Sequence, residues 1–166
     1  MSYADIGNLG LTESSTNAGD FPDAGNCIIQ EGKKYCSIYN AGAAAIAAGD
    51  VLGLFLTTPA SGHVSGTATT VVECTLSGTM VVAGVGIGAI AAGSYGYIQV
   101  GGHCTNITTT NAVSEGDALI CNGDATPDFT AAPAVATEEH MPFAFADADD
   151  DGTVGSGFLT GCALSI

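Results

Sequence analysis

An acidic run near the C-terminal end is the segment whose residue types and spacing best match a metal-binding motif. Residues 147–152 read Asp-Ala-Asp-Asp-Asp-Gly and match the first six positions of an EF-hand calcium loop. Calcium takes several hard oxygen ligands, which alternate carboxylates in a tight glycine turn can supply. The motif is incomplete, because its twelfth position is Phe158 instead of glutamate and the flanking segments read as strands. We therefore expect a solvated hairpin loop, with weak calcium binding by Asp147, Asp149 and Asp151 as the alternative and no other cofactor.

The histidines His63, His103 and His140 are the candidates for acid–base chemistry. A catalytic triad needs a nucleophile, a base and an orienting carboxylate together in space, but the sequence contains no G-x-S-x-G nucleophile elbow. His103 and Cys104 are neighbours and would point to opposite faces of a strand, so they would not form a dyad. The spaced glycines of residues 83–88 are not followed by the Lys-Ser/Thr of a phosphate loop. We predict no catalytic residue and no enzymatic activity.

The charge balance restricts the partners that this chain can bind. Seventeen acidic residues face only two basic ones, Lys33 and Lys34, which gives a net charge of -15. Nucleic acid and anionic lipid are both recognised through Lys and Arg. We therefore expect no nucleic-acid or membrane binding, and a protein partner that is neutral or basic. A charge that serves only to keep the protein soluble is the alternative.

Six cysteines leave the redox state open. No C-x-x-C pair is present, which argues against a zinc ribbon or a thioredoxin-like site. Cys27 and Cys36 flank a predicted hairpin: they would be directly opposite with Glu31-Gly32 as its turn, or diagonal with Gly32-Lys33. A disulfide is thus geometrically possible, but cytosolic thiols normally stay reduced. We predict buried free thiols, with three disulfides as the alternative.

The elements that must position these residues read as short strands separated by turn residues. Gly, Asp, Asn and Ser punctuate the chain at intervals of 8 to 15 residues, which is typical of a sandwich or barrel. The alanine-rich stretch 41–48 is too short for an independent helix, so we predict a loop or single turn there; 135–140 is a second weak helical candidate. The fold expected for residues 26–166 is one all-β domain, a small β-barrel or β-sandwich. Its predicted strands are 27–31, 34–39, 51–57, 70–76, 79–85, 95–100, 104–108, 118–121, 142–146 and 157–165.

Residues 1–25 differ from the rest and predict an extended N-terminal arm. The segment is rich in Gly, Asn, Ser and Asp and has no hydrophobic period. It has neither the basic nor the apolar region of a signal peptide, so we expect none. Its isolated apolar residues exceed what a solvated tail requires, and we expect the arm to attach to a partner without stabilising the domain; a passive tail is the alternative. These candidate interaction residues are Ile6, Leu9, Leu11 and Phe21.

Four short segments carry a resemblance to a known family: AIAAGDVL at 45–52, GSYGYIQVGG at 93–102, VSEGDAL at 113–119 and FLTGCAL at 158–164. Through them, residues 38–166 resemble the capsid decoration or head-stabilising proteins of tailed phages. The resemblance implies a compact β-barrel or β-tulip-like domain without catalytic activity. It also implies a homo-oligomer, expected to be a trimer, that docks on the major capsid protein. The expected location is the capsid exterior of a virion assembled in the host cytoplasm.

Two other functions fit the same composition. One is a surface- or carbohydrate-binding β-module of a phage fibre or extracellular assembly, for which Tyr95 and Tyr97 would lie on one face of a strand. Such modules usually expose Trp or Tyr platforms, and this chain has no Trp. The other is a calcium-dependent adhesion domain built on residues 147–152.

Overall fold

The computed structural model describes residues 11–17, 20, 27–54, 69–73, 82–121, 129–131 and 143–160. In these ranges the chain forms strands and contains no α-helix, so the all-β expectation is confirmed. Within the same ranges no helix is long and apolar enough to cross a membrane. The candidate helix at 135–140 lies outside the described residues, and 41–48 is a loop as predicted. The strands are β1 (Ser14–Ser15), β2 (Cys27–Gln30), β3 (Lys33–Asn40), β4 (Val51–Leu54), β5 (Thr69–Glu73), β6 (Val82–Gly86), β7 (Tyr95–Thr108), β8 (Ala118–Cys121), β9 (Phe129–Ala131), β10 (Ala144–Ala146) and β11 (Val154–Leu159).

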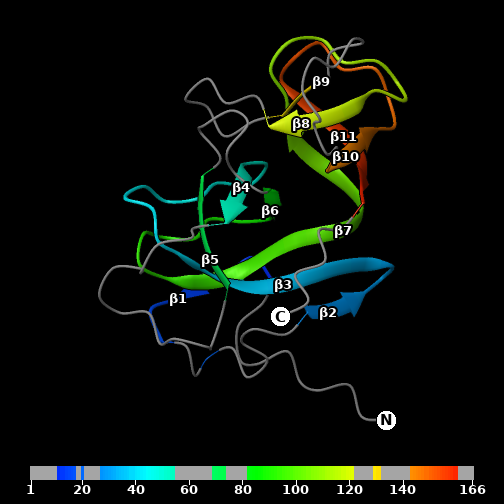
Figure 1. The fold of residues 1–166 in the computed structure, drawn as a ribbon. Coiled ribbons are helices and arrows are strands. Elements are labelled where there is room, and N and C mark those ends of the chain that lie inside the picture. The colour runs from blue at the N-terminus through cyan, green and yellow to red at the C-terminus, as the bar shows by residue number, and fades with distance from the viewer. Residues whose placement is uncertain are drawn as a thin grey trace.

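The eleven strands belong to one sheet, ordered β2-β3-β5-β4-β6-β7-β11-β10-β8-β9, with β1 paired to β7. Strand β3 also pairs with β7, so β3, β5, β4, β6 and β7 pair in a circle. The sheet as a whole is not a closed barrel, because β11, β10, β8 and β9 continue outward from β7. Among the described residues the strand pairings are antiparallel except the parallel β3–β5 pair, and an isolated bridge between Thr109 and Phe129 of β9 is also parallel. Figure 1 shows the β8–β11 group at one end of the molecule and the long β3 and β7 strands at the other.

Strand β7 connects the two ends of the molecule. It runs unbroken for 14 residues, pairing with β3 over its first half and with β11 over its second (Figure 1). The prediction of two separate strands at 95–100 and 104–108, with the Gly101-Gly102 pair as the break between them, is therefore wrong. Gly102 has a φ of +83°, which bends the strand without reversing it, and a Cβ there would lie 2.6 Å from the carbonyl oxygen of Gly32. A glycine pair here allows close approach of two backbones instead of a turn.

The β2–β3 hairpin resolves the open question about its turn. Glu31 and Gly32 both have positive φ values, 51° and 77°, as the two central residues of a type I′ turn require. This turn places Cys27 directly opposite Cys36, and the two form a disulfide. Cys121 is disulfide-bonded as well, whereas Cys104 is a buried free thiol. The prediction of free thiols is thus wrong for three cysteines. For the first pair, the hairpin register sets the two side chains directly opposite each other, which places the sulfur atoms within bonding distance.

A repeated turn precedes three of the strands. In each, a glycine with positive φ (Gly49, Gly93 or Gly116) is followed one residue later by a backbone N–H that donates to the carbonyl three residues before it. The strand then begins at the next residue, as in β4, β7 and β8. Asp50 and Asp117 reinforce two of these turns, since each carboxylate accepts a hydrogen bond from the backbone N–H three residues earlier. The local sequence alone therefore sets where these strands start.

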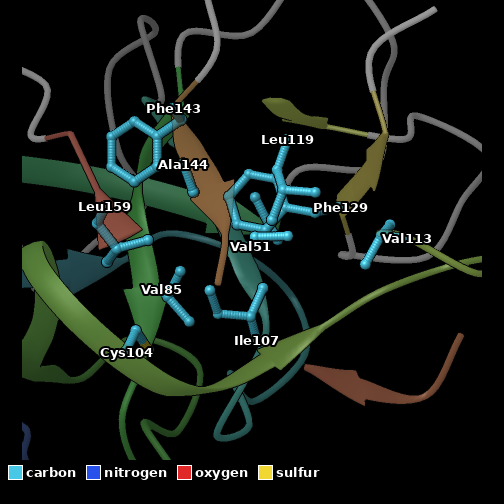
Figure 2. Packing of buried hydrophobic residues seen from close by; sticks show 11 residues of the cluster. Val51, Val85, Cys104, Ile107, Val113, Leu119, Phe129, Phe143, Ala144 and Leu159 are labelled. Carbon is cyan, nitrogen blue, oxygen red and sulfur yellow. The ribbon is translucent and has the colours of Figure 1, made fainter. Parts of the chain in front are cut away.

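Three groups of buried side chains make up the core. A tyrosine cluster, defined by Tyr35, Tyr39, Tyr95 and Tyr97, lies between β3 and β7. A second, aliphatic group lies on the opposite face of these two strands. The third joins β4, β6 and β7 to the β8–β11 group, and Figure 2 shows its aromatic and aliphatic side chains converging between those strands. This last group fixes the outer strands to the rest of the sheet.

Part of the expected N-terminal arm belongs to the sheet. Ser14 and Ser15 pair with the first two residues of β7, and Leu11 packs against the tyrosine cluster. The predicted arm thus contributes a two-residue strand that the sequence did not predict, while its attachment to a partner stays a prediction. The segment has no hydrophobic alternation, and two residues that join a sheet by backbone hydrogen bonds do not need it. Ile6, Leu9 and Phe21 lie outside the described residues.

Candidate functional site

One solvent-facing surface of the β7–β11–β10 region combines exposed aromatic rings with a polar cluster. Cross-strand pairing sets Phe158 of β11 opposite both His103 of β7 and Phe145 of β10. Because side chains directly opposite each other point to the same side of a sheet, these three form one row. Ser156 and Asp147 lie on the same side. We call these five residues the outer face.

The aromatic rings of the outer face are accessible to a partner. Phe145 is 41% exposed and Phe158 is 55% exposed. The ring of Phe158 lies against the imidazole of His103, with the ring centroids 5.2 Å apart. Val154, two residues before Ser156 on the same strand, adds a further exposed apolar side chain. Scattered apolar residues on a surface are ordinary, but a contiguous group on one rigid sheet indicates an interaction surface.

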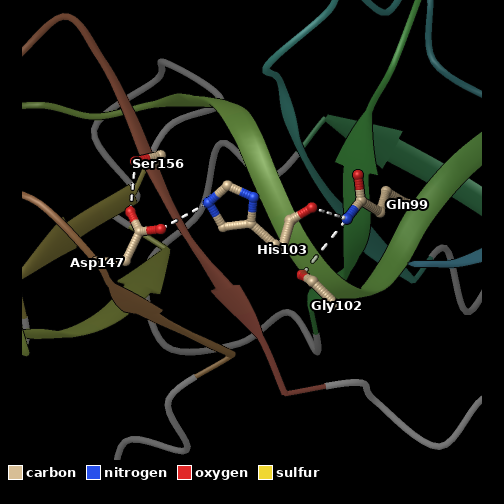
Figure 3. Close-up of polar contacts among 5 residues, drawn as sticks. All are labelled: Gln99, Gly102, His103, Asp147 and Ser156. Atoms are coloured by element: carbon tan, nitrogen blue, oxygen red, sulfur yellow. Dashed lines mark hydrogen bonds and ion pairs between the residues drawn. The ribbon is translucent and has the colours of Figure 1, made fainter. Parts of the chain in front are cut away.

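The polar part of the outer face is centred on the carboxylate of Asp147. One carboxylate oxygen lies 2.6 Å from Nε2 of His103, and the other accepts a hydrogen bond from the Ser156 hydroxyl. Figure 3 shows the carboxylate between the two partners. The hydrogen bond from Ser156 is the largest influence that lowers the pKa of Asp147, and His103 lowers it further. Asp147 is therefore an anion at neutral pH and holds the imidazole in place.

This serine, aspartate and histidine do not make a catalytic triad. In a triad the histidine stands between the other two, so that it takes the proton of the serine. Here Asp147 stands between Ser156 and His103, and no hydrogen bond joins the hydroxyl to the imidazole. The arrangement orients side chains and supplies no activated nucleophile. His63 and His140 lie outside the described residues.

The remaining aspartates of the 147–152 loop are each held by hydrogen bonds from within the protein. Asp149 accepts from the backbone N–H of Glu115, 2.9 Å away, and Asp151 accepts from the Thr153 hydroxyl at 3.1 Å. Asp150 accepts from the Thr109 hydroxyl and from the backbone of its own loop. In the part of the chain that the structure describes, no three His, Cys, Asp or Glu side chains gather as a metal site would require. Calcium binding by Asp147, Asp149 and Asp151 stays a prediction, and the described residues form no preformed site for the ion.

Tyr95 and Tyr97 do not offer a stacking platform. The two share a face of β7, as predicted, but each is only 1% exposed and belongs to the tyrosine cluster. Their rings serve the core, which removes the feature that favoured a carbohydrate-binding module.

Sequence reasoning missed the residues that make up the outer face. Phe145 and Phe158 each lie between two buried residues of their strands, and that alternation was the available signal. The register that sets them opposite each other depends on contacts between strands far apart in sequence. Asp147 was found, but as a calcium candidate and not as the partner of His103.

Comparison with known proteins finds similarity to solved structures alone. No protein-family model matches the sequence, and no curated protein matches it. Among solved structures, the chain is similar to the N base of the head fiber gp8.5 in bacteriophage phi29, with a TM-score of 0.49 and 11% identity. The match covers 76% of this chain and 92% of that one. At this level of similarity the likeness assigns neither a family nor a function.

Proposed function

We propose that this chain is a non-enzymatic virion structural protein that decorates and stabilises the outer surface of a capsid. It acts as a homotrimer bound to the major capsid protein. The observation that carries the proposal is the outer face, where two exposed phenylalanines stand on one rigid sheet. The charged neighbour, Asp147, holds His103 and Ser156 in place and does not suggest catalysis. The resemblance of residues 38–166 to phage decoration proteins points to the same function.

The charges favour a capsid protein over a second copy as the occupant of the outer face. Asp147 places a negative charge beside the aromatic row, and it is followed in the chain by Asp149, Asp150 and Asp151. Two copies meeting through this face would bring these carboxylates together, and the copies would repel each other there. A neutral or basic protein surface with an apolar centre would complement this arrangement. Burying each phenylalanine would contribute roughly 1.5–3 kcal/mol.

Contacts between copies are better placed at the β2 end of the sheet. Strands β2 and β9 end the strand order, but Phe129 of β9 also bridges to Thr109, so β2 is the end that has a partner on one side only within the described residues. Such an edge pairs readily with another chain. Ile29 of β2 is 70% exposed and lies at this edge. A trimer built through the β2 edge would leave the outer face free for the capsid.

Variants of the outer face test this proposal. We expect Phe145→Ser with Phe158→Ser to lower the affinity of the purified protein for capsids stripped of it by at least about tenfold, which is about 1.4 kcal/mol. The control is Ala44→Ser with Ala45→Ser, which places the same two serines at exposed apolar positions away from both the outer face and the β2 edge. Bound copies per capsid, measured by sedimentation and gel densitometry, give the result. Equal occupancy for the double variant and the control would contradict docking through the outer face.

A further inference from the structure

A small pocket lies on the opposite side of β7 from the aromatic row, between the N-terminal segment, β3 and the end of β6. Its volume is about 220 Å³. This is below the roughly 300 Å³ at which pockets for drug-sized molecules begin, so it fits a single small ring. Its apolar wall is formed by Leu11 and Ile87, and its polar lining includes Lys33, Tyr35, Gln99 and Asn106. None of these residues has a role in the outer face.

Two irregularities in β7 shape the pocket. Between the pairs Lys34↔Gly101 and Tyr35↔Gln99 the β7 strand has one extra residue. It has another where residues 105 and 106 together oppose Ser156 of β11. Bulges of this kind turn side chains out of the regular alternation and are frequent beside binding sites. They bring Gln99 and Asn106, from two parts of one strand, to the same cavity.

One buried polar group in the pocket has no hydrogen-bond partner among the described residues. Gln99 is only 3% exposed, and its amide nitrogen lies within hydrogen-bond distance of the backbone carbonyls of Gly101, Gly102 and His103. Figure 3 shows the contacts to Gly102 and His103. The amide oxygen of Gln99 accepts no hydrogen bond from any described residue, and the Tyr35 hydroxyl, which lines the same pocket, has no hydrogen-bond partner in the described ranges either. Buried polar groups are nearly always satisfied, so the Gln99 oxygen indicates a partner outside the chain, either a water or a ligand.

The chemistry of the lining defines that partner. Gln99 offers an acceptor, whereas Lys33 and Tyr35 offer donors, so the ligand must both donate and accept. Burial raises the pKa of Tyr35, which keeps its hydroxyl protonated, and burial also raises the pKa of the Cys104 thiol in the same pocket. No thiolate nucleophile is therefore available at neutral pH. An anionic ligand would match Lys33 but would meet the repulsion of a chain with a net charge of -15.

We propose that this pocket binds one neutral pyranose ring, either a free sugar or the end of a glycan chain. Hydroxyl groups donate and accept, which satisfies the amide oxygen of Gln99 and the donors of Lys33 and Tyr35 at once. The apolar wall covers one face of the ring. A capsid-surface protein with such a site would hold particles weakly to glycosylated surfaces. This inference rests on residues that are not part of the outer face. It can therefore be wrong while the proposed docking on the capsid is right.

Saturation-transfer NMR and calorimetry on the full chain test the proposal. The probes are the methyl glycosides of glucose, galactose and mannose, with glucuronate as the charged analogue. We expect at least one neutral glycoside to bind with a Kd near the millimolar range, and glucuronate to bind less tightly. A trisaccharide of the bound sugar should bind within about threefold of the monosaccharide if only a terminal ring enters. Much tighter binding of the trisaccharide would mean a glycan-chain groove and would overturn the one-ring pocket.

Variants place the sugar in the pocket. Lys33→Met and Tyr35→Phe should each weaken binding by at least about fivefold, which is the loss of one hydrogen bond. Lys34→Met is the matched control, because this neighbouring lysine points to the other side of β3 and does not line the pocket; it should leave the Kd unchanged. If Tyr35→Phe unfolds the domain, the comparison of the Kd of Lys33→Met with that of Lys34→Met is enough to decide whether the sugar lies in the pocket. No binding of any neutral glycoside at about 50 mM, or binding insensitive to Lys33→Met, would overturn the proposal.

Discussion

Asp150 illustrates how single carboxylates hold the acidic loop together. Burial by itself would raise its pKa, but hydrogen bonds from the Thr109 hydroxyl and from the backbone N–H groups of Thr153 and Gly152 outweigh burial and leave the pKa lowered. A carboxylate with a lowered pKa in the folded state stabilises the fold above its unfolded pKa. That contribution is lost as the pH falls through the folded value.

Replacing Asp150 should therefore destabilise the protein in a pH-dependent way. We expect Asp150→Ala to lower the free energy of unfolding by about 1–2 kcal/mol at pH 7, because it removes several hydrogen bonds to a charged group. The difference from wild type should shrink as the pH is lowered from about 5 to about 3. Thermal unfolding measured from pH 7 down to about pH 3 checks this pH dependence. The control is Asp151→Ala, because the side chain of Asp151 is exposed. A difference that stays constant down to pH 3 would contradict the assignment.

At the scale of elements, the β2–β3 hairpin shows what the sequence could and could not predict. The sequence predicted its two strands and left two turns open, of which the structure has Glu31-Gly32, the turn that sets Cys27 opposite Cys36. The redox state of the pair does not follow from register alone. Free thiols were predicted because cytosolic thiols normally stay reduced, and this prediction is wrong for Cys27 and Cys36. Likewise the strand starts after Gly49, Gly93 and Gly116 were readable locally, since each turn carries its own hydrogen bonds.

Long-range pairing explains most of what sequence reasoning missed. In the sequence the Gly101-Gly102 pair looks like a turn. In the structure β7 continues through it, because β7 pairs with β3 before the glycines and with β11 after them. Strand β1 carries no periodic signal, and the outer face exists only because β7, β10 and β11 lie side by side. The acidic loop was recognised from spacing, but the partners that separate its carboxylates, such as Glu115 and Thr109, come from other parts of the chain.

The disulfide of the hairpin makes a measurable contribution to stability. Closing a loop of this length contributes about 2–3 kcal/mol by the chain-entropy estimate, so Cys27→Ser with Cys36→Ser should lower the Tm by about 4–12 °C. Thiol titration of the denatured, unreduced protein should find no more than two free thiols, since Cys27, Cys36, Cys121 and the partner of Cys121 are bonded. A count near six would show that the disulfides do not form.

The N-terminal segment can be tested in the same manner. A chain that starts at Gly25 loses β1 and the packing of Leu11 on the tyrosine cluster. Burial of one leucine side chain contributes roughly 1.5–3 kcal/mol when complete, and Leu11 is only partly buried, so we expect a Tm lower by a few degrees. An unchanged Tm would mean that the whole arm is independent of the domain.

For the whole molecule, a rigid sheet with few long charged side chains suits a protein that docks and stays bound. Only 11% of the residues are charged. Ordering Lys, Glu and Arg side chains on binding costs rotamer entropy, and a surface of Thr, Ser, Gly and Ala avoids much of this cost. The net charge of -15 then selects neutral or basic partners and keeps the free protein soluble.

Quantitative mass spectrometry of purified virions tests the central claim most directly. If the chain decorates a capsid, purified particles should contain it in high copy, at a fixed ratio to the major capsid protein that does not change through further purification. Mild dissociation should release it from the surface while the capsid stays closed. Absence of the chain from purified particles, or its presence at only a few copies per particle, would contradict a role in decorating the capsid.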